Sequence, residues 1–189
     1  MTISQDILKF GPEKYTATCA VAGAIFLALA AAPIASPCRV AAMWRRYPRS
    51  VWPGRILSVV ALVWSALWLL AMPLGPFAII RDPMPILLVV AIAAVWYLCD
   101  DLLSCRAVGG VLVLVPTLLL SAAQWHPSPG RLVPLIVGYL LAVAGMFFIA
   151  KPHLLRDALF FLAASPVRTR LAGALFAVVG VLLLVAAFA

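Results

Sequence analysis

The sequence predicts an all-α, polytopic membrane bundle of about six transmembrane helices with a short interfacial helix, built as a single domain over residues 1–189. Hydrophobic residues make up 66% of the 189-residue chain and charged residues only 11%, which is too little charge to cover a soluble domain of this size. The apolar residues also form runs long enough to cross a hydrocarbon core about 30 Å thick. The predicted spans are 17–36, 56–72, 84–104, 107–124, 132–150 and 171–189.

The first span, 17–36, follows a segment of balanced charge, so the positive region of a signal peptide is missing and we expect the span to be uncleaved. Apolar area does not drive helix association in lipid, and small residues instead mark the faces where helices pack closely. The span carries small residues at every fourth position, which predicts a packing face: Ala20, Ala24, Ala28 and Ala32.

A basic loop follows the first span. It is interleaved with aromatic residues, and it is expected to lie in the cytoplasm and to bind anionic lipid headgroups. Docking of an acidic partner subunit is the alternative. The candidate docking residues are Arg39, Arg45, Arg46, Arg49 and Arg55.

The third span ends in adjacent carboxylates, Asp100 and Asp101, with Arg106 shortly after them. Ionisable residues in a span are costly and suggest function. One hypothesis is a proton- or cation-binding pair in which one carboxylate has its pKa raised by its neighbour. The alternative is that one carboxylate faces water and the other pairs with Arg106 across the turn.

The fifth and sixth spans carry further small residues, predicted as packing faces: Gly138, Ala142 and Gly145, then Gly173, Ala177 and Gly180. Between these spans, residues 153–164 are too short to cross the membrane. Charged and apolar residues separate there at helical spacing, which predicts a helix lying on the inner interface and ending before Pro166.

Charge sorting gives the orientation of the spans. With the arginine-rich loop inside, ten Lys and Arg residues fall on the inner side and four on the outer, as the positive-inside rule requires. We therefore expect an integral protein of the bacterial inner (cytoplasmic) membrane with both termini in the periplasm. The same rule accounts for the net charge of +8, so no nucleic-acid partner is expected.

The last third has a specific order of features. A span ends near Pro152, a short amphipathic connector follows, and a final glycine-containing span completes it. This order resembles the small two-span YjeT-type inner-membrane proteins, with matching residues Gly145, Pro152, Arg156, Arg170, Gly173 and Gly180. The resemblance covers residues 145–189 and implies an accessory membrane protein rather than a reaction.

The residues offer no catalytic, cofactor or metal motif: HExxH, GxSxG and GxxxxGK[ST] do not occur. The favoured hypothesis is a non-catalytic integral membrane subunit that anchors or stabilises a larger membrane assembly, with membrane lipids and other subunits as partners. The alternatives are a small transporter or channel that uses the inner-face carboxylates, and a membrane enzyme that handles lipid or quinone.

Overall fold

The computed structural model describes residues 12–71, 82–98, 102–124 and 126–188, and within these ranges the regular structure is helical throughout. The all-α prediction is thus confirmed. The elements are α2 (Pro12–Ala35), α3 (Pro37–Arg46), η1 (Tyr47–Arg49), α4 (Val51–Ala71), α5 (Met84–Leu98), α6 (Leu103–Ala123), η3 (Pro129–Arg131), α7 (Leu132–Ala150), α8 (Pro152–Leu162) and α9 (Pro166–Phe188).

Five of the described helices, α2, α4, α6, α7 and α9, are long and apolar enough to cross a membrane. The protein is therefore an integral membrane protein. Of the predicted span 84–104, the structure describes α5 with 15 residues, residues 99–101 lie outside the described part, and α6 already begins at Leu103. Six spans therefore stay a prediction.

Several element boundaries also differ from the prediction. Hydropathy placed the start of four spans too late, because α2, α4, α6 and α9 begin up to five residues earlier, among polar residues or prolines. Residues 37–46, expected as part of a loop, form α3, which starts with Pro37 in its first turn. Proline suits that position because its missing N–H has no partner there. The short helix predicted at 153–164 is present as α8.

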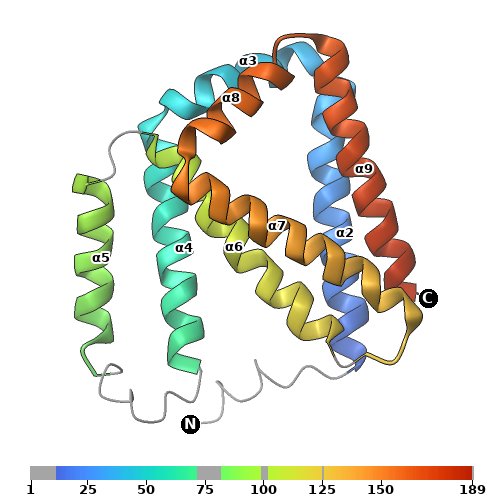
Figure 1. The fold of residues 1–189 in the computed structure, drawn as a ribbon, viewed down its shortest axis with the longest axis horizontal. Helices are drawn as coiled ribbons and strands as arrows, with labels where there is room; N and C mark the ends of the chain where they lie inside the picture. The colour runs from blue at the N-terminus through green and yellow to red at the C-terminus, as the bar shows by residue number, and fades with distance from the viewer. Residues whose placement is uncertain (1–11, 72–81, 99–101, 125, 189) are drawn as a thin grey trace.

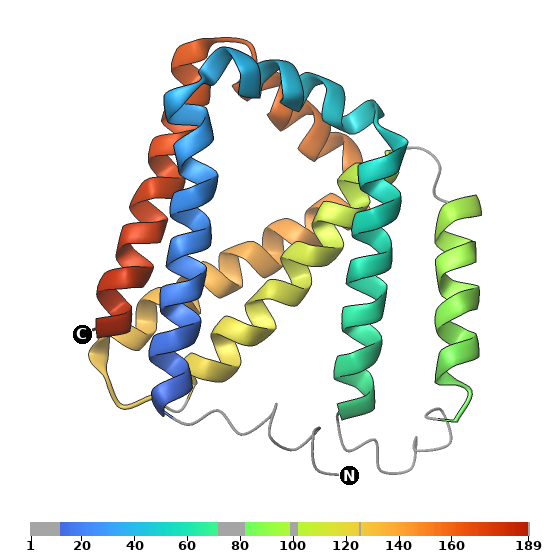
Figure 2. The same ribbon diagram turned by 180° about the vertical axis from the view of Figure 1, so that it is seen from behind.

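The same order of helices, long, short and long, occurs twice along the chain (Figure 1). First α2 runs the length of the molecule, α3 crosses its end and α4 returns; then α7, α8 and α9 do the same. The two crossing helices, α3 and α8, contact each other and run in opposite directions in both views (Figures 1 and 2). We call the end of the molecule that they cover the basic end.

Glycine pairs lie in the two most extensive helix contacts, α2 with α9 and α6 with α7. A Cβ atom added to Gly109 would lie 2.9 Å from the carbonyl oxygen of Gly145, and one added to Gly145 would lie 2.8 Å from that of Gly109. Gly23 and Gly180 show the same reciprocal arrangement, at 2.9 and 3.0 Å. The helices cross so closely that only glycine fits.

α4 packs on α6, and α5 packs chiefly against α4 at the edge of the molecule (Figure 1). Trp96 of α5 contacts α4 at this edge. Its ring lies under the guanidinium of Arg55, 5.4 Å from centroid to Cζ, and its Nε1–H donates to Ser58 Oγ at 3.3 Å. Both partners belong to α4, so one side chain provides the polar link between the two helices.

Candidate functional site

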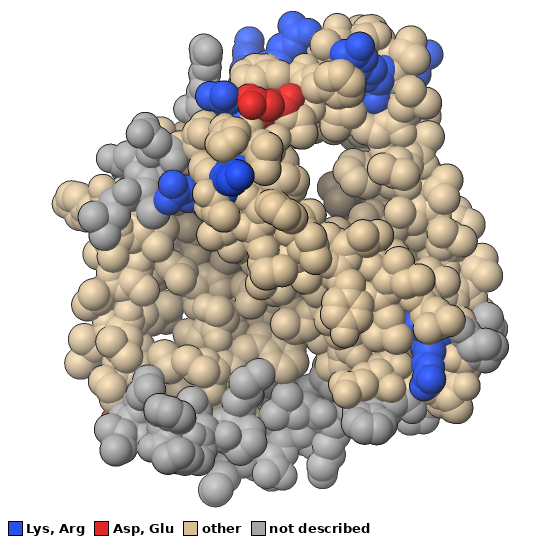
Figure 3. Space-filling view, viewed as in Figure 1, with Lys and Arg blue, Asp and Glu red and all other residues tan. Residues whose placement is uncertain are grey.

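Basic side chains gather at the basic end, over α3 and α8 (Figure 3). The described charges come from five elements: Arg39, Arg45 and Arg46 on α3, Arg55 on α4, Arg106 on α6, Lys151 and Arg156 at α8, and Arg168 and Arg170 on α9. Asp157 is the only carboxylate there among the described residues, and Arg156 binds it at 2.9 Å. The alternating spans therefore bring the predicted basic segments together at one end.

The five predicted docking arginines have different surroundings. Arg45 donates from Nη2 to the carbonyl oxygen of Ala163 at 2.6 Å, which satisfies a free carbonyl at the C-terminus of α8. Arg55 lies over Trp96. Arg39 and Arg46 are exposed, whereas the side chain of Arg49 lies outside the described part. The arginines thus do not act as one uniform patch.

Arg45 and Arg46 line a pocket at the seam between α3 and α8. Its volume is about 480 Å³, and Ser50 and Phe160 complete its wall. The hydroxyl of Ser50 donates to the carbonyl oxygen of Tyr47 at 2.7 Å, so the free donors in the wall belong to the two arginines. An open pocket with cationic donors and one aromatic wall is suited to an anion that carries an apolar part.

Buried hydroxyls fasten the elements under this pocket. The hydroxyl of Ser104 donates to the carbonyl oxygen of Ser50, and Tyr47 Oη donates to the carbonyl oxygen of Ser104 at 3.3 Å. On the other side, Thr169 Oγ1 donates to the carbonyl oxygen of Leu162 at 3.0 Å. Burial raises the pKa of the Tyr47 phenol, and the neighbouring Cys105 raises it further. These bonds join η1 to α6 and α8 to α9.

The predicted carboxylate site cannot be placed, because Asp100 and Asp101 lie outside the described residues. Arg106 lies in the first turns of α6 rather than in a loop, and it is half-buried. Leu102, which precedes α6, has φ 56° and ψ 32°, a left-handed conformation uncommon for a bulky residue. Both readings of the acidic pair, ion binding and ion pairing, stay predictions.

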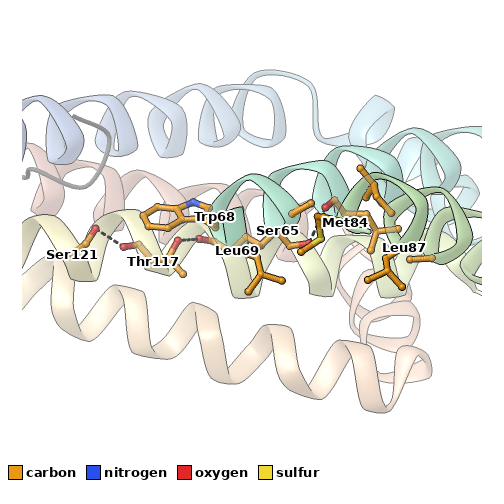
Figure 4. A pocket seen from close by; sticks show the side chains of 12 residues that line it. Ser65, Trp68, Leu69, Met84, Leu87, Thr117 and Ser121 are labelled. Atoms are coloured by element: carbon orange, nitrogen blue, oxygen red, sulfur yellow. Dashed lines mark hydrogen bonds between the residues drawn. The ribbon is translucent and has the colours of Figure 1, made fainter. Parts of the chain in front are cut away.

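A long groove runs between α4, α5 and α6 (Figure 4), with a volume of about 700 Å³. Most of its wall is apolar, and it includes Trp68 and Met84. Its hydroxyls bond to carbonyl oxygens of their own helices: Ser65 to Leu62 at 2.8 Å, Thr117 to Leu114 at 2.6 Å and Ser121 to Thr117 at 2.6 Å. The described residues that line the groove include no charged side chain, so the groove suits hydrocarbon better than an ion.

The predicted packing residues divide into two groups. Gly138, Gly145, Gly173 and Gly180 are buried in contacts between helices, with Ala142 and Ala177 half-buried beside them. The alanine stripe of α2 is different: Ala20 is half-buried, and Ala24, Ala28 and Ala32 are exposed. α2 meets α9 through Gly23 and Ala30 instead, which lie on another face. Within the chain, the stripe is not a packing face.

Sequence reasoning missed a cluster at the end opposite the basic end. Tyr15 is 1% exposed, its ring stacks on His126 with centroids 3.9 Å apart, and its Oη donates to the carbonyl oxygen of Ala186 at 3.0 Å. This one side chain joins α2, the loop after α6, and α9. In the sequence this cluster is marked only by a lone tyrosine at the start of a span. Such a tyrosine is also typical of an anchor at the membrane interface, so it did not predict the cluster.

The described residues contain no group of three or more His, Cys, Asp or Glu side chains that could hold a metal ion. No protein-family model, no curated protein and no solved structure matches the chain. The resemblance of residues 145–189 to YjeT-type proteins therefore stays a prediction, and function has to be argued from the geometry alone.

Proposed function

We propose that the protein is a non-catalytic integral membrane subunit that stabilises a larger assembly by packing the alanine stripe of α2 against a transmembrane helix of a partner protein. The observation that carries the proposal is the exposure of Ala24, Ala28 and Ala32 on a membrane-spanning helix. Small residues allow helices to approach closely in lipid, where large apolar side chains gain nothing by leaving the acyl chains.

The outward face of α9 provides the contrast. Apart from Ala174, its exposed residues there are large and branched: Val167, Leu171, Leu175, Val178, Val181, Leu182 and Val185. Such a face is typical of lipid contact. α9 and α7 use their small residues, Gly173, Gly180, Gly138 and Gly145, in contacts within the chain. No described helix covers the stripe on α2, which supports a partner protein as its neighbour.

Charge favours a different protein over a second copy as that neighbour. Two copies in the same orientation that paired through α2 would bring their basic ends side by side, because α3 follows α2 directly. Among the described residues of that end, nine basic side chains accompany one carboxylate. Like charges at close range repel, whereas a partner with acidic residues at this level would be attracted.

The test is the mass of the full-length protein purified from its native membrane in mild detergent. We expect the wild type to elute as a complex with one partner in fixed ratio. The Ala24→Leu and Ala28→Leu variants should elute alone, because a leucine would hold the partner helix away. The matched control is Val178→Leu on α9, where the side chain is 56% exposed, and it should keep the partner.

Circular dichroism must show unchanged helix content in all three variants, so that loss of the complex reports on the interface. A wild-type protein that elutes as a lone monomer would rule the proposal out. So would leucine variants that retain the partner as well as the control does.

A further inference from the structure

We infer that the pocket between α3 and α8 binds the phosphate of an anionic phospholipid headgroup, with Arg45 and Arg46 as the recognising residues. This site is separate from the alanine stripe and does not depend on the proposed subunit role. It gives one specific location to the general attraction between a basic membrane protein and anionic lipid.

The arrangement of Arg45 suits a phosphate. One N–H of its guanidinium is fixed by the carbonyl oxygen of Ala163 at 2.6 Å. A guanidinium has five N–H donors in a rigid fork, so others remain for a second acceptor. The bond to α8 thus holds the side chain in place and lowers the entropy lost when a phosphate binds.

Arg46 supplies the second cation. It is exposed beside Arg45 at the end of α3 and lines the same pocket. The described carboxylate of this end, Asp157, is bound to Arg156 at 2.9 Å and does not line the pocket. Both charged side chains that line the pocket are thus cationic, which favours an anion over a zwitterionic headgroup.

The apolar part of the wall favours a lipid over a soluble phosphate. Phe160 of α8 lines the pocket, and the same two helices expose Met43 and Phe161 by 58% and 60%. A pocket of about 480 Å³ is also larger than a bare phosphate ion requires. Glycerol and the first acyl carbons can lie against these side chains while the phosphate meets the arginines.

Other arginines of this end differ in their contacts. Arg55 lies over Trp96, and Arg168 lies over the ring of Phe161, 4.2 Å from its centroid. Arg39 and Arg170 are exposed and do not line the pocket. Specific binding must therefore depend on Arg45 and Arg46, whereas a diffuse surface potential would depend on all of them alike.

The experiment titrates the purified full-length protein with lipid and measures binding by native mass spectrometry. The probes are phosphatidylglycerol, phosphatidylcholine with the same acyl chains, and soluble glycerol phosphate. We expect phosphatidylglycerol to bind most tightly. The Arg45→Gln/Arg46→Gln variant should weaken its binding by about 30-fold, on the order expected for two basic residues at a membrane surface, and should leave phosphatidylcholine binding unchanged.

The control is Arg39→Gln/Arg170→Gln, which removes the same charge from the same end outside the pocket, and it should weaken binding far less. Because Arg45 also bonds α8, Arg46→Gln alone provides a milder variant, with an expected loss of about fivefold. An equal loss in control and pocket variants would overturn the inference. So would an unchanged affinity in Arg46→Gln, or full displacement of the lipid by millimolar glycerol phosphate.

Discussion

At the scale of single residues, the closest contacts in this protein are made by glycines that lack any room for a methyl group. Gly109 and Gly110 are neighbours on α6, yet only the first faces α7. A Cβ on Gly109 would lie 2.9 Å from backbone atoms of Gly145 and Ile149, whereas the nearest atom to a Cβ on Gly110 is 3.6 Å away. Substituting Gly109 and Gly110 in turn therefore distinguishes the effect of helix packing from the effect of helix propensity.

We therefore expect Gly109→Ala to destabilise the protein by about 1–3 kcal/mol, because backbone atoms cannot move aside without separating the helices. Gly110→Ala should be neutral or stabilising by up to about 1 kcal/mol, since alanine favours the helix. Unfolding in mixed micelles of increasing SDS content measures both values. Equal effects of the two substitutions would contradict the described crossing of α6 and α7.

Tyr47 gives a second prediction at this scale, in its response to pH. Burial raises the pKa of its phenol above the ordinary 10.0, so the folded chain holds this proton more tightly than the unfolded chain does. The resulting stability is fully present below pH 10 and is lost as the pH rises through the folded-state pKa. Ionisation also removes the donor of the bond to Ser104.

The measurement for Tyr47 is the difference in phenolate absorbance between the wild type and Tyr47→Phe during alkaline titration. We expect the Tyr47 signal to appear with a midpoint above pH 10 and to return towards the ordinary value once the protein is unfolded. A midpoint at or below the ordinary value in the folded protein would show that the phenol is solvated.

At the scale of elements, α5 is the helix that the structure holds least firmly. It packs chiefly on α4, and its polar link is Trp96, through Arg55 and Ser58. A buried hydrogen bond contributes about 1 kcal/mol, so this link is a large part of what fixes α5. The groove between α4, α5 and α6 depends on it for one wall.

Trp96→Phe keeps an aromatic ring but removes the N–H, and it should increase hydrogen exchange across Met84–Leu98 by about fivefold, which corresponds to one hydrogen bond. Exchange in α6 should stay unchanged. Trp68→Phe, at a tryptophan that lines the groove, is the matched control and should leave α5 protected. Equal protection of α5 in both variants would show that other contacts hold it.

Sequence patterns predicted some of these elements for good physical reasons and missed others. The helical separation of charged and apolar residues, with Pro166 after them, predicted α8. A similar segment forms α3, where Pro37 begins the helix and Arg45 and Arg46 end it. The density of arginine in this segment indicated a basic loop rather than a helix. The alanine stripe predicted a helix face that another helix can approach closely. It did not predict which helix packs there, because that depends on how spans far apart in the sequence assemble.

At the scale of the whole molecule, charge sorting predicted that separate basic segments share one end, and the fold brings them together there (Figure 3). The seam between α3 and α8 could not be predicted, because it joins Arg45 to Ala163, residues 118 positions apart. Hydropathy carries no information about such pairing. The unit formed by α2, α3 and α4 thus meets the unit formed by α7, α8 and α9 at the basic end. The face of α2 that carries Ala24, Ala28 and Ala32 is left uncovered by the described helices.

The central claim is that this open face packs on a partner protein. Val21 lies on the same face of α2 as Ala24 and Ala28, at helical spacing, and is 59% exposed, so a benzophenone amino acid can replace it without filling the stripe. Photo-crosslinking in the native membrane should yield one discrete protein adduct from position 21, none from position 178 on α9, and none from position 21 when Ala28 is leucine. Lipid adducts alone at both positions, or an adduct with the mass of two copies of this chain, would contradict the account.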